Sequence, residues 1–115
     1  MKRGEIWTLQ DDQYATKARP VVLLQSELAD EFESVVLALL SSFERKSSPA
    51  RVLIEPAQSN GLMKTSYVMT EKLLTVPRID LGIRVRCLTE EQMHAISRAL
   101  VGVLGIEAED VQQLD

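Results

Sequence analysis

The sequence predicts an α+β domain, in which a mainly antiparallel sheet forms a small barrel and a helix closes the chain. Three observations support this prediction. The chain has 115 residues, the length of one compact domain and too few for two. Five short segments rich in apolar and β-branched residues precede any strong helical pattern. The best-marked helix follows them, and strands followed by a helix are typical of α+β folds.

The predicted strands differ in how deeply they are buried. The second and third are continuous apolar runs, the pattern of strands that are buried on both faces. Arg19-Pro20 opens the second strand, and Pro77 stops the fifth. The five predicted strands cover residues 5–9, 21–24, 35–40, 51–55 and 66–76. Polar connections cover residues 10–17, 43–50 and 59–61, and residues 26–33 are expected to form one or two helical turns.

The predicted helix begins after Thr89 and ends at Gly105. Thr89 is a candidate N-cap, and Gln92 three residues later completes a capping box. Glu90 and Glu91 lie in the first turn, where the helix dipole favours negative charge. Glycine is a common C-terminal stop. Residues at helical spacing predict one apolar face: Met93, Ile96, Leu100, Val103 and Leu104.

Composition is that of an ordinary globular protein, with 45% apolar and 26% charged residues. No apolar run approaches the ~20 residues of a membrane span, and no apolar stretch follows the basic N-terminus, so we expect no membrane association and no signal peptide. A single cysteine, Cys87, fits a reducing cytosol. One cysteine and one histidine argue against a zinc site. We therefore expect a cytoplasmic protein without metal or cofactor.

The net charge of −4 hides an uneven distribution. The last nine residues hold four acids and no base, and removing those four from the total of 17 acids leaves 13 acids against 13 bases. Bases outnumber acids between residues 43 and 86, so this middle segment can bind a polyanion locally. We expect residues 1–106 to form one domain and residues 107–115 to form an acidic tail. Charge alone leaves the partner open.

No common nucleophile, phosphate-loop or metalloprotease motif is present. His94 stands alone, off the apolar face of the predicted helix, and is best interpreted as an ordinary solvated residue. For Cys87 a buried or interface thiol is favoured over a catalytic one. Asp11-Asp12 can bind a divalent ion weakly, but a solvated loop is the favoured interpretation.

Four segments have an order and spacing found together in one known family. Residues 2–7 (KRGEIW), a polar loop and residues 19–22 (RPVV) form the first. Residues 36–42 form a strand that ends in two hydroxyl residues, residues 61–68 lead into a further strand, and residues 88–93 start the closing helix. Over about residues 1–106 the chain thus resembles the MazF/PemK (Kid) toxins of type II toxin–antitoxin systems. Each motif alone is weak, and their order is what makes the resemblance specific.

The resemblance implies a small SH3-like (CcdB/MazF-like) barrel with a C-terminal helix, and a homodimer that an antitoxin similar to MazE, with an acidic C-terminal segment, inhibits. It also implies a metal-independent, sequence-specific endoribonuclease (an mRNA interferase) that cuts single-stranded RNA. Arg19 takes the place of the family's catalytic arginine, and Ser41 that of its catalytic threonine. Glu71, where an aspartate is common, is the candidate base. The expected RNA-binding residues are Lys17, Ser42, Arg45, Lys46 and Lys72.

Ribonuclease chemistry makes sense of these residue types. The internal 2′-OH of RNA is the nucleophile, and its attack leaves a 2′,3′-cyclic phosphate and a 5′-OH. The enzyme supplies a base, charge stabilisation and a proton for the leaving oxygen. The planar fork of Arg19 suits two phosphoryl oxygens. The same residues also have plain structural interpretations: a carboxylate partner for Arg19, a strand end for Ser41, and a surface acid for Glu71.

Two departures from the family keep other functions open. Some members use a histidine in the first loop, which this chain lacks, and some use an arginine where Met69 stands. A non-enzymatic toxin similar to CcdB, which binds DNA gyrase, is therefore the alternative. A barrel module that binds protein or RNA without chemistry is a third possibility. Arg19-Pro20 and the Ser41-Ser42 pair favour the nuclease.

Overall fold

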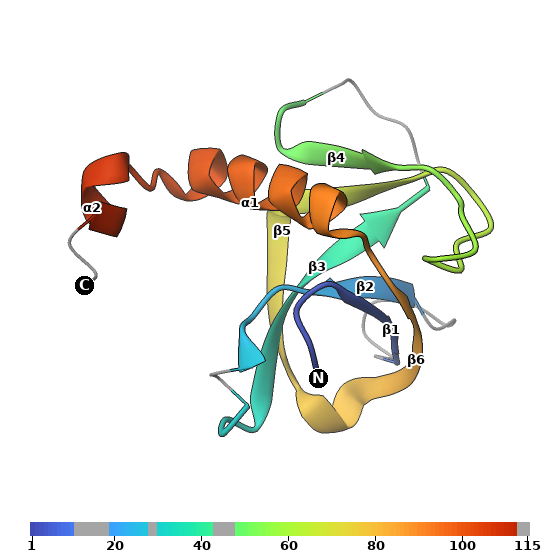
Figure 1. The fold of residues 1–115 in the computed structure, drawn as a ribbon. Helices are drawn as coiled ribbons and strands as arrows, with labels where there is room; N and C mark the ends of the chain where they lie inside the picture. The colour runs from blue at the N-terminus through green and yellow to red at the C-terminus, as the bar shows by residue number, and fades with distance from the viewer. Residues whose placement is uncertain (11–18, 28–29, 43–47, 113–115) are drawn as a thin grey trace.

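A computed structural model describes residues 1–10, 19–27, 30–42 and 48–112 (Figure 1). Six antiparallel strands form one sheet in the order β4-β5-β3-β2-β1-β6. The five predicted strands are confirmed to within two residues at each end, and β6 is an addition. The strands are β1 (Glu5–Leu9), β2 (Arg19–Leu23), β3 (Ser34–Ser41), β4 (Arg51–Ile54), β5 (Ser66–Pro77) and β6 (Leu81–Cys87).

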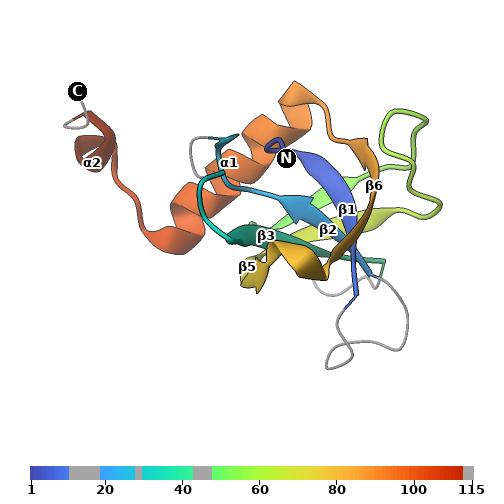
Figure 2. The same ribbon diagram turned by 90° about the horizontal axis from the view of Figure 1, so that it is seen from below.

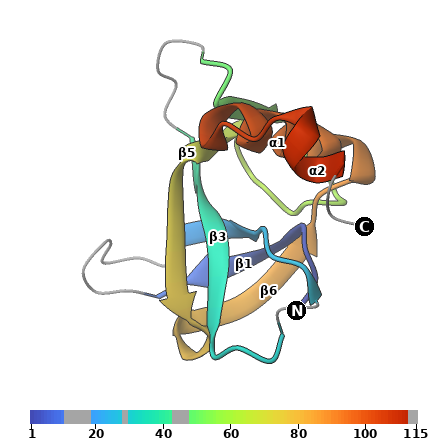
Figure 3. The same cartoon turned by 90° about the vertical axis from the view of Figure 1, so that its left-hand side faces the viewer.

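The predicted α+β class is confirmed, but the sheet is not closed. It curls strongly, so that β3 and β5 run along one side and β1, β2 and β6 cross below the helix (Figure 3). Within the described residues β4 and β6 do not pair with each other, so "barrel" describes the curl only loosely. The turn after β4 instead lies beside β6, where a Cβ on Gly61 would come within 2.9 Å of the Val85 side chain.

A bulge interrupts the pairing of β5, which has β3 and β4 as neighbours. Four residues of β5, 69–72, stand opposite Leu39 alone, between the pairs Ala38↔Leu73 and Leu40↔Val68. Extra residues on one strand bend it and increase its twist. The first half of β5 therefore pairs with β4, while its second half runs on along β3 and ends at Pro77. The 3₁₀ turn η2 (Arg78–Asp80) then leads into β6.

Apolar side chains pack on both faces of β2 and β3, as their continuous apolar runs predict. One face, which includes Val22 and Leu40, packs with helix α1 through the fully buried Ile96. The opposite face, which includes Leu23 and Leu37, packs against the curled parts of the sheet. Burial on both faces makes these two strands the rigid centre of the molecule.

Helix α1 (Glu90–Leu104) begins and ends where the sequence predicts. The capping box is present: the Gln92 N–H donates to the Thr89 hydroxyl over 3.1 Å, and the Thr89 N–H donates to the Gln92 side chain over 2.9 Å. Gly105 ends the helix in the left-handed conformation, with φ of 68°. Because α1 runs past the sheet, its last turn is exposed (Figures 1 and 2), and the predicted apolar face is wrong at Val103 and Leu104.

Two smaller differences from the sequence prediction concern local helical structure. The short helix α2 (Ala108–Gln112) was not predicted, and the Asp110 side chain caps it by accepting from the Glu107 N–H. In the segment 26–33, predicted as one or two helical turns, Glu27 lies in a 3₁₀ turn, and residues 30–33 form a turn and a bend. No helix within the described part of the chain combines the length and the apolar character that a membrane crossing requires.

Glu5 ties the N-terminal strand to its neighbours. Its buried carboxylate accepts from the Lys2 N–H over 2.8 Å and the Trp7 indole N–H over 3.2 Å, and from the Arg84 guanidinium of β6 over 3.3 Å. Burial alone would raise the pKa of this carboxyl. The hydrogen bonds from Lys2, Trp7 and Arg84 outweigh that effect and hold the pKa of Glu5 below its ordinary value of 4.5.

We expect Glu5→Gln to lower the free energy of unfolding at pH 7 by about 1 kcal/mol, since the amide keeps the shape but loses the charge-assisted bonds. The figure is modest because Arg84 is 60% exposed. A lowered folded-state pKa means that the stabilisation is complete above pH 4.5 and is lost as the pH falls through the folded-state pKa of Glu5. Urea unfolding of both proteins across this pH range checks it. A difference in stability that does not shrink at low pH would contradict the assignment.

Candidate active site

The register of β2 against β3 sets the candidate site. Val21 pairs with Leu39 and Leu23 pairs with Leu37. Continuing this register by two residues places Arg19, the first residue of β2, opposite Ser41, the last residue of β3. Residues directly opposite in an antiparallel pair project on the same face. The Arg19 guanidinium and the Ser41 hydroxyl are 22 positions apart in the chain. The register places them side by side, where the central strands β2 and β3 begin and end.

These two residues line one cavity of about 400 Å³. A volume in this range suits a nucleotide-sized ligand. Arg19 is half-buried. The predicted RNA-binding residue Ser42 also lines the cavity. The described lining residues are Arg19, Pro20, Leu40, Ser41, Ser42, Leu62, Met63, Lys64 and Ser66.

The cavity has the donors of an anion site. Arg19 and Lys64 supply positive charge, and Ser41 and Ser42 supply hydroxyls, whereas the Ser66 hydroxyl donates to the Lys64 carbonyl. Among the described lining residues there is no carboxylate, imidazole or thiol. This set can bind a phosphate and stabilise charge that develops on it, but it holds no obvious general base.

Glu71, the candidate base, lies away from the described lining of this cavity. It sits in the bulge of β5, and both of its carboxylate oxygens accept from Arg51 Nε of β4, over 3.1 and 3.3 Å. The structure thus brings Arg19 and Ser41 together and places Glu71 in an ion pair instead. Lys72 is exposed beside it. A base role for Glu71 remains a proposal.

Sequence reasoning missed Met63 and Lys64 as site residues. They belong to the segment 61–68 that resembles the family, and Lys64 is one of the bases of the middle segment. Residues in a turn show no periodicity, so nothing in the pattern places them at a cavity. Of the other predicted RNA-binding residues, Lys17, Arg45 and Lys46 lie outside the described residues, as does the Asp11-Asp12 pair.

Other candidate residues form no second chemical site. His94 is exposed on α1, with its Nε2 at 3.9 Å from a Glu90 carboxylate oxygen, as expected for a solvated residue. Cys87 is exposed, so of the favoured interpretations the thiol buried within the chain is wrong, and the interface thiol stays a prediction. In the portion of the chain that the structure describes, no three His, Cys, Asp or Glu side chains group as metal ligands would.

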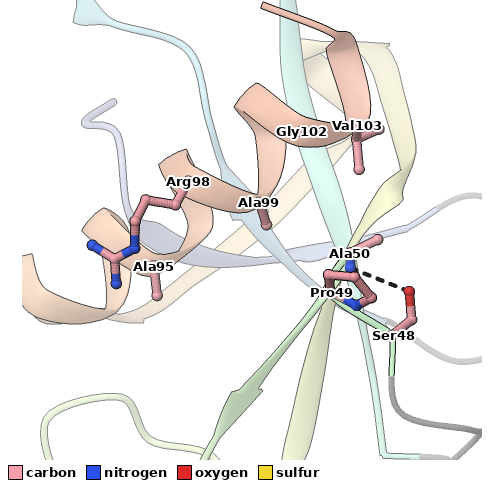
Figure 4. Close-up of a pocket in the computed structure, with 8 residues that line it drawn as sticks. All are labelled: Ser48, Pro49, Ala50, Ala95, Arg98, Ala99, Gly102 and Val103. Atoms are coloured by element: carbon pink, nitrogen blue, oxygen red, sulfur yellow. Dashed lines mark hydrogen bonds between the residues drawn. The ribbon is translucent and has the colours of Figure 1, made fainter.

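A second cavity, of about 580 Å³, lies between α1 and the turn before β4 (Figure 4). Ala95, Ala99 and Val103 point from the helix toward Pro49 and Ala50. The described lining is otherwise Ser48, Gly102 and Arg98. Its described lining holds one cation, Arg98, and one hydroxyl residue, Ser48, and so lacks the group of cations and hydroxyls that makes the Arg19 cavity the candidate active site.

The fold and site together define a small α+β protein with a curled sheet and a cavity that is lined by Arg19, Lys64 and hydroxyl residues. A family model described as PemK-like, MazF-like toxin of type II toxin–antitoxin system matches residues 2–104. The probable endoribonuclease MazF of Mycolicibacterium smegmatis is 36% identical over 107 residues, which are 92% of this chain and 98% of that protein. The chain therefore belongs to the PemK-like, MazF-like toxins of type II toxin–antitoxin systems.

Solved structures agree with this assignment. The toxin MazF-mt6 of Mycobacterium tuberculosis has a TM-score of 0.76 at 27% identity, with 90% of this chain and 98% of that chain covered. A mycobacterial endoribonuclease in complex with its cognate antitoxin has a TM-score of 0.78 at 22% identity, with 93% and 97% covered. The second similarity supports the fold alone.

Proposed function

We propose that this toxin is a metal-independent, sequence-specific endoribonuclease that cleaves single-stranded RNA. The observation that carries the proposal is that Arg19, the first residue of β2, and Ser41, the last residue of β3, line one cavity. The relative that is 36% identical is named a probable endoribonuclease. That name favours the nuclease over the alternatives of a gyrase-binding toxin and a binding module without chemistry.

The cavity supplies the electrostatic part of the reaction. The 2′-O of the RNA attacks the adjacent phosphorus, its proton passes to a base, and the bond to the 5′-O breaks as that oxygen takes up a proton. Negative charge grows on the phosphoryl oxygens in between. The Arg19 fork is suited to bind two of those oxygens, and the Ser41 hydroxyl to orient one. Because the nucleophile belongs to the substrate, no metal-bound water is required.

Glu71 is the proposed base, and its ion pair with Arg51 fixes where its carboxylate stands. The proposed RNA contacts outside the reaction centre are Lys17, Ser42, Arg45, Lys46 and Lys72. Ser42 supports this proposal best, since it lines the same cavity as Arg19. Residues 107–115 are proposed to be an acidic tail outside a toxin domain of residues 1–106, and the protein is proposed to act in the cytoplasm.

Two protein partners are proposed. One is a second copy of the chain, and the other is a cognate antitoxin with an acidic C-terminal segment that competes with RNA. Several large apolar side chains are exposed and available for such contacts. They include Leu53, Ile83, Val101, Leu104 and Val111. A mycobacterial endoribonuclease with the same fold has been solved with its cognate antitoxin.

The first test is cleavage of a long single-stranded RNA in the presence of EDTA. Discrete fragments are expected, each new end carrying a 2′,3′-cyclic phosphate or a 5′-OH, because the internal 2′-OH attacks. A substrate with deoxyribose at the cut nucleotide serves as the control and should stay intact. Cleavage that needs added magnesium would refute the mechanism.

Arg19→Ala should lower the cleavage rate ~10²-fold or more, the usual scale for the loss of a positioned transition-state donor. Ser41→Ala should lose most activity, whereas Ser41→Thr, which keeps the hydroxyl, should retain it.

Glu71→Gln tests the proposed base. If Glu71→Gln cleaves at the wild-type rate with an unchanged pH profile, Glu71 is not the base.

Light scattering should show a two-fold homodimer at micromolar concentration, since symmetric pairing is the commonest way to cover an exposed apolar surface. A dimer also brings the basic middle segments of two chains together. Residues 1–106 carry no net charge, so RNA binding depends on such a local concentration of positive charge. A monomer that cleaves normally would overturn this prediction.

A further inference from the structure

One wall of the Arg19 cavity is a turn that is built around Asn60. This side chain is fully buried, with 0% of its surface exposed. Its carbonyl oxygen accepts from the Ala57 N–H over 3.1 Å and from the Leu62 N–H over 2.9 Å, and its amide donates to the Glu55 carbonyl over 2.9 Å. A single buried amide thus satisfies three backbone groups, which fixes the shape of the turn.

Further contacts attach the turn at both ends. Gly61 adopts a φ of +70°, a conformation that side chains disfavour, and Leu62 packs against the core cluster beneath α1. On the far side, the Ser66 hydroxyl donates to the Lys64 carbonyl over 3.0 Å, and the Thr65 hydroxyl donates to Glu55 over 3.2 Å. The two residues between these attachments are therefore held in place.

Those two residues, Met63 and Lys64, both line the Arg19 cavity and both face solvent. Met63 is 94% exposed, the largest value among the large apolar residues in the described chain. At this exposure the Met63 side chain adds no packing to the hydrophobic core. An apolar side chain held out from a rigid turn beside an anion site instead suits a ligand that has both a phosphate and an apolar face.

We propose that Lys64 and Met63 form the substrate-binding wall of this site: Lys64 binds an RNA phosphate next to the scissile one, and Met63 packs on the adjoining base. This inference rests on the proposed nuclease function. Lysine acts as a mobile point charge and suits a neighbouring phosphate, whereas the fork of Arg19 suits the reacting one. Bases of single-stranded RNA are unstacked and expose flat apolar faces, and a thioether adapts its shape to such a face.

The test measures kcat and KM on an RNA oligonucleotide that the wild type cleaves, for Lys64→Ala and Met63→Ala. Lys2→Ala and Ile79→Ala are the matched controls, because Lys2 is exposed, Ile79 is 89% exposed and neither lines the cavity. Lys64→Ala should raise KM roughly tenfold with kcat nearly unchanged, and should lower the log–log salt slope of RNA binding by about 0.7, the contribution of one phosphate on a single strand.

Met63→Ala should change base preference rather than rate. On a pool of RNAs that randomises the bases flanking the cut, discrimination at one flanking position should fall by roughly fivefold, since a packed side chain that contacts a base stabilises its binding. Both controls should match the wild type in KM, salt slope and base preference.

Unchanged KM, salt slope and base preference in both variants would overturn the proposal. So would a loss that is confined to self-association, measured by light scattering, which would assign the turn to a protein contact. A wild-type protein that cleaves no RNA would refute the proposed function itself. A wild type that cleaves while Arg19→Ala does not, with both turn variants normal, would refute only this inference.

Discussion

The register of β2 against β3 determines both the core and the site. Both strands are apolar on both faces, so a slip by one residue would exchange one buried set for another, and burial alone specifies the register weakly. Polar bonds specify it instead. The Leu24 N–H donates to the Val36 carbonyl over 3.1 Å, and the Val36 N–H donates to the Gln25 side chain over 2.9 Å. These bonds lie at one end of the strand pair. The same register, continued to the other end, places Arg19 opposite Ser41.

Strand β5 passes both the cavity and the edge strand β4. Ser66, at the start of this strand, lines the cavity, whereas Glu71, in the bulge, lies against Arg51 of the edge strand. Five positions along a strand span about 16 Å, and an odd spacing places two side chains on opposite faces, so the two residues have different surroundings. Under the proposed function, the cavity supplies electrostatic stabilisation, and the proposed base, Glu71, stands outside its described lining.

Sequence reasoning succeeded where the determining interactions are local. Thr89 and Gln92 cap the helix within four residues of chain, and the apolar runs mark β2 and β3 because both faces are buried. It missed β6, whose side chains are largely exposed and whose pairing with β1 is interrupted by bulges. It could not predict the ion pair between Arg51 and Glu71, because these residues are 20 positions apart in the chain and meet only when β4 pairs with β5.

The turn around Asn60 has a consequence for how such a toxin can diverge. Its shape depends on a buried amide and on backbone groups, and not on the identities of the two side chains that it presents. Substitutions at those two positions therefore leave folding and the reaction centre intact. If the turn contacts RNA as we propose, point mutations at Met63 and Lys64 can change target preference without altering Arg19 or Ser41. Related chains would then share a chemistry and differ in the messages they destroy.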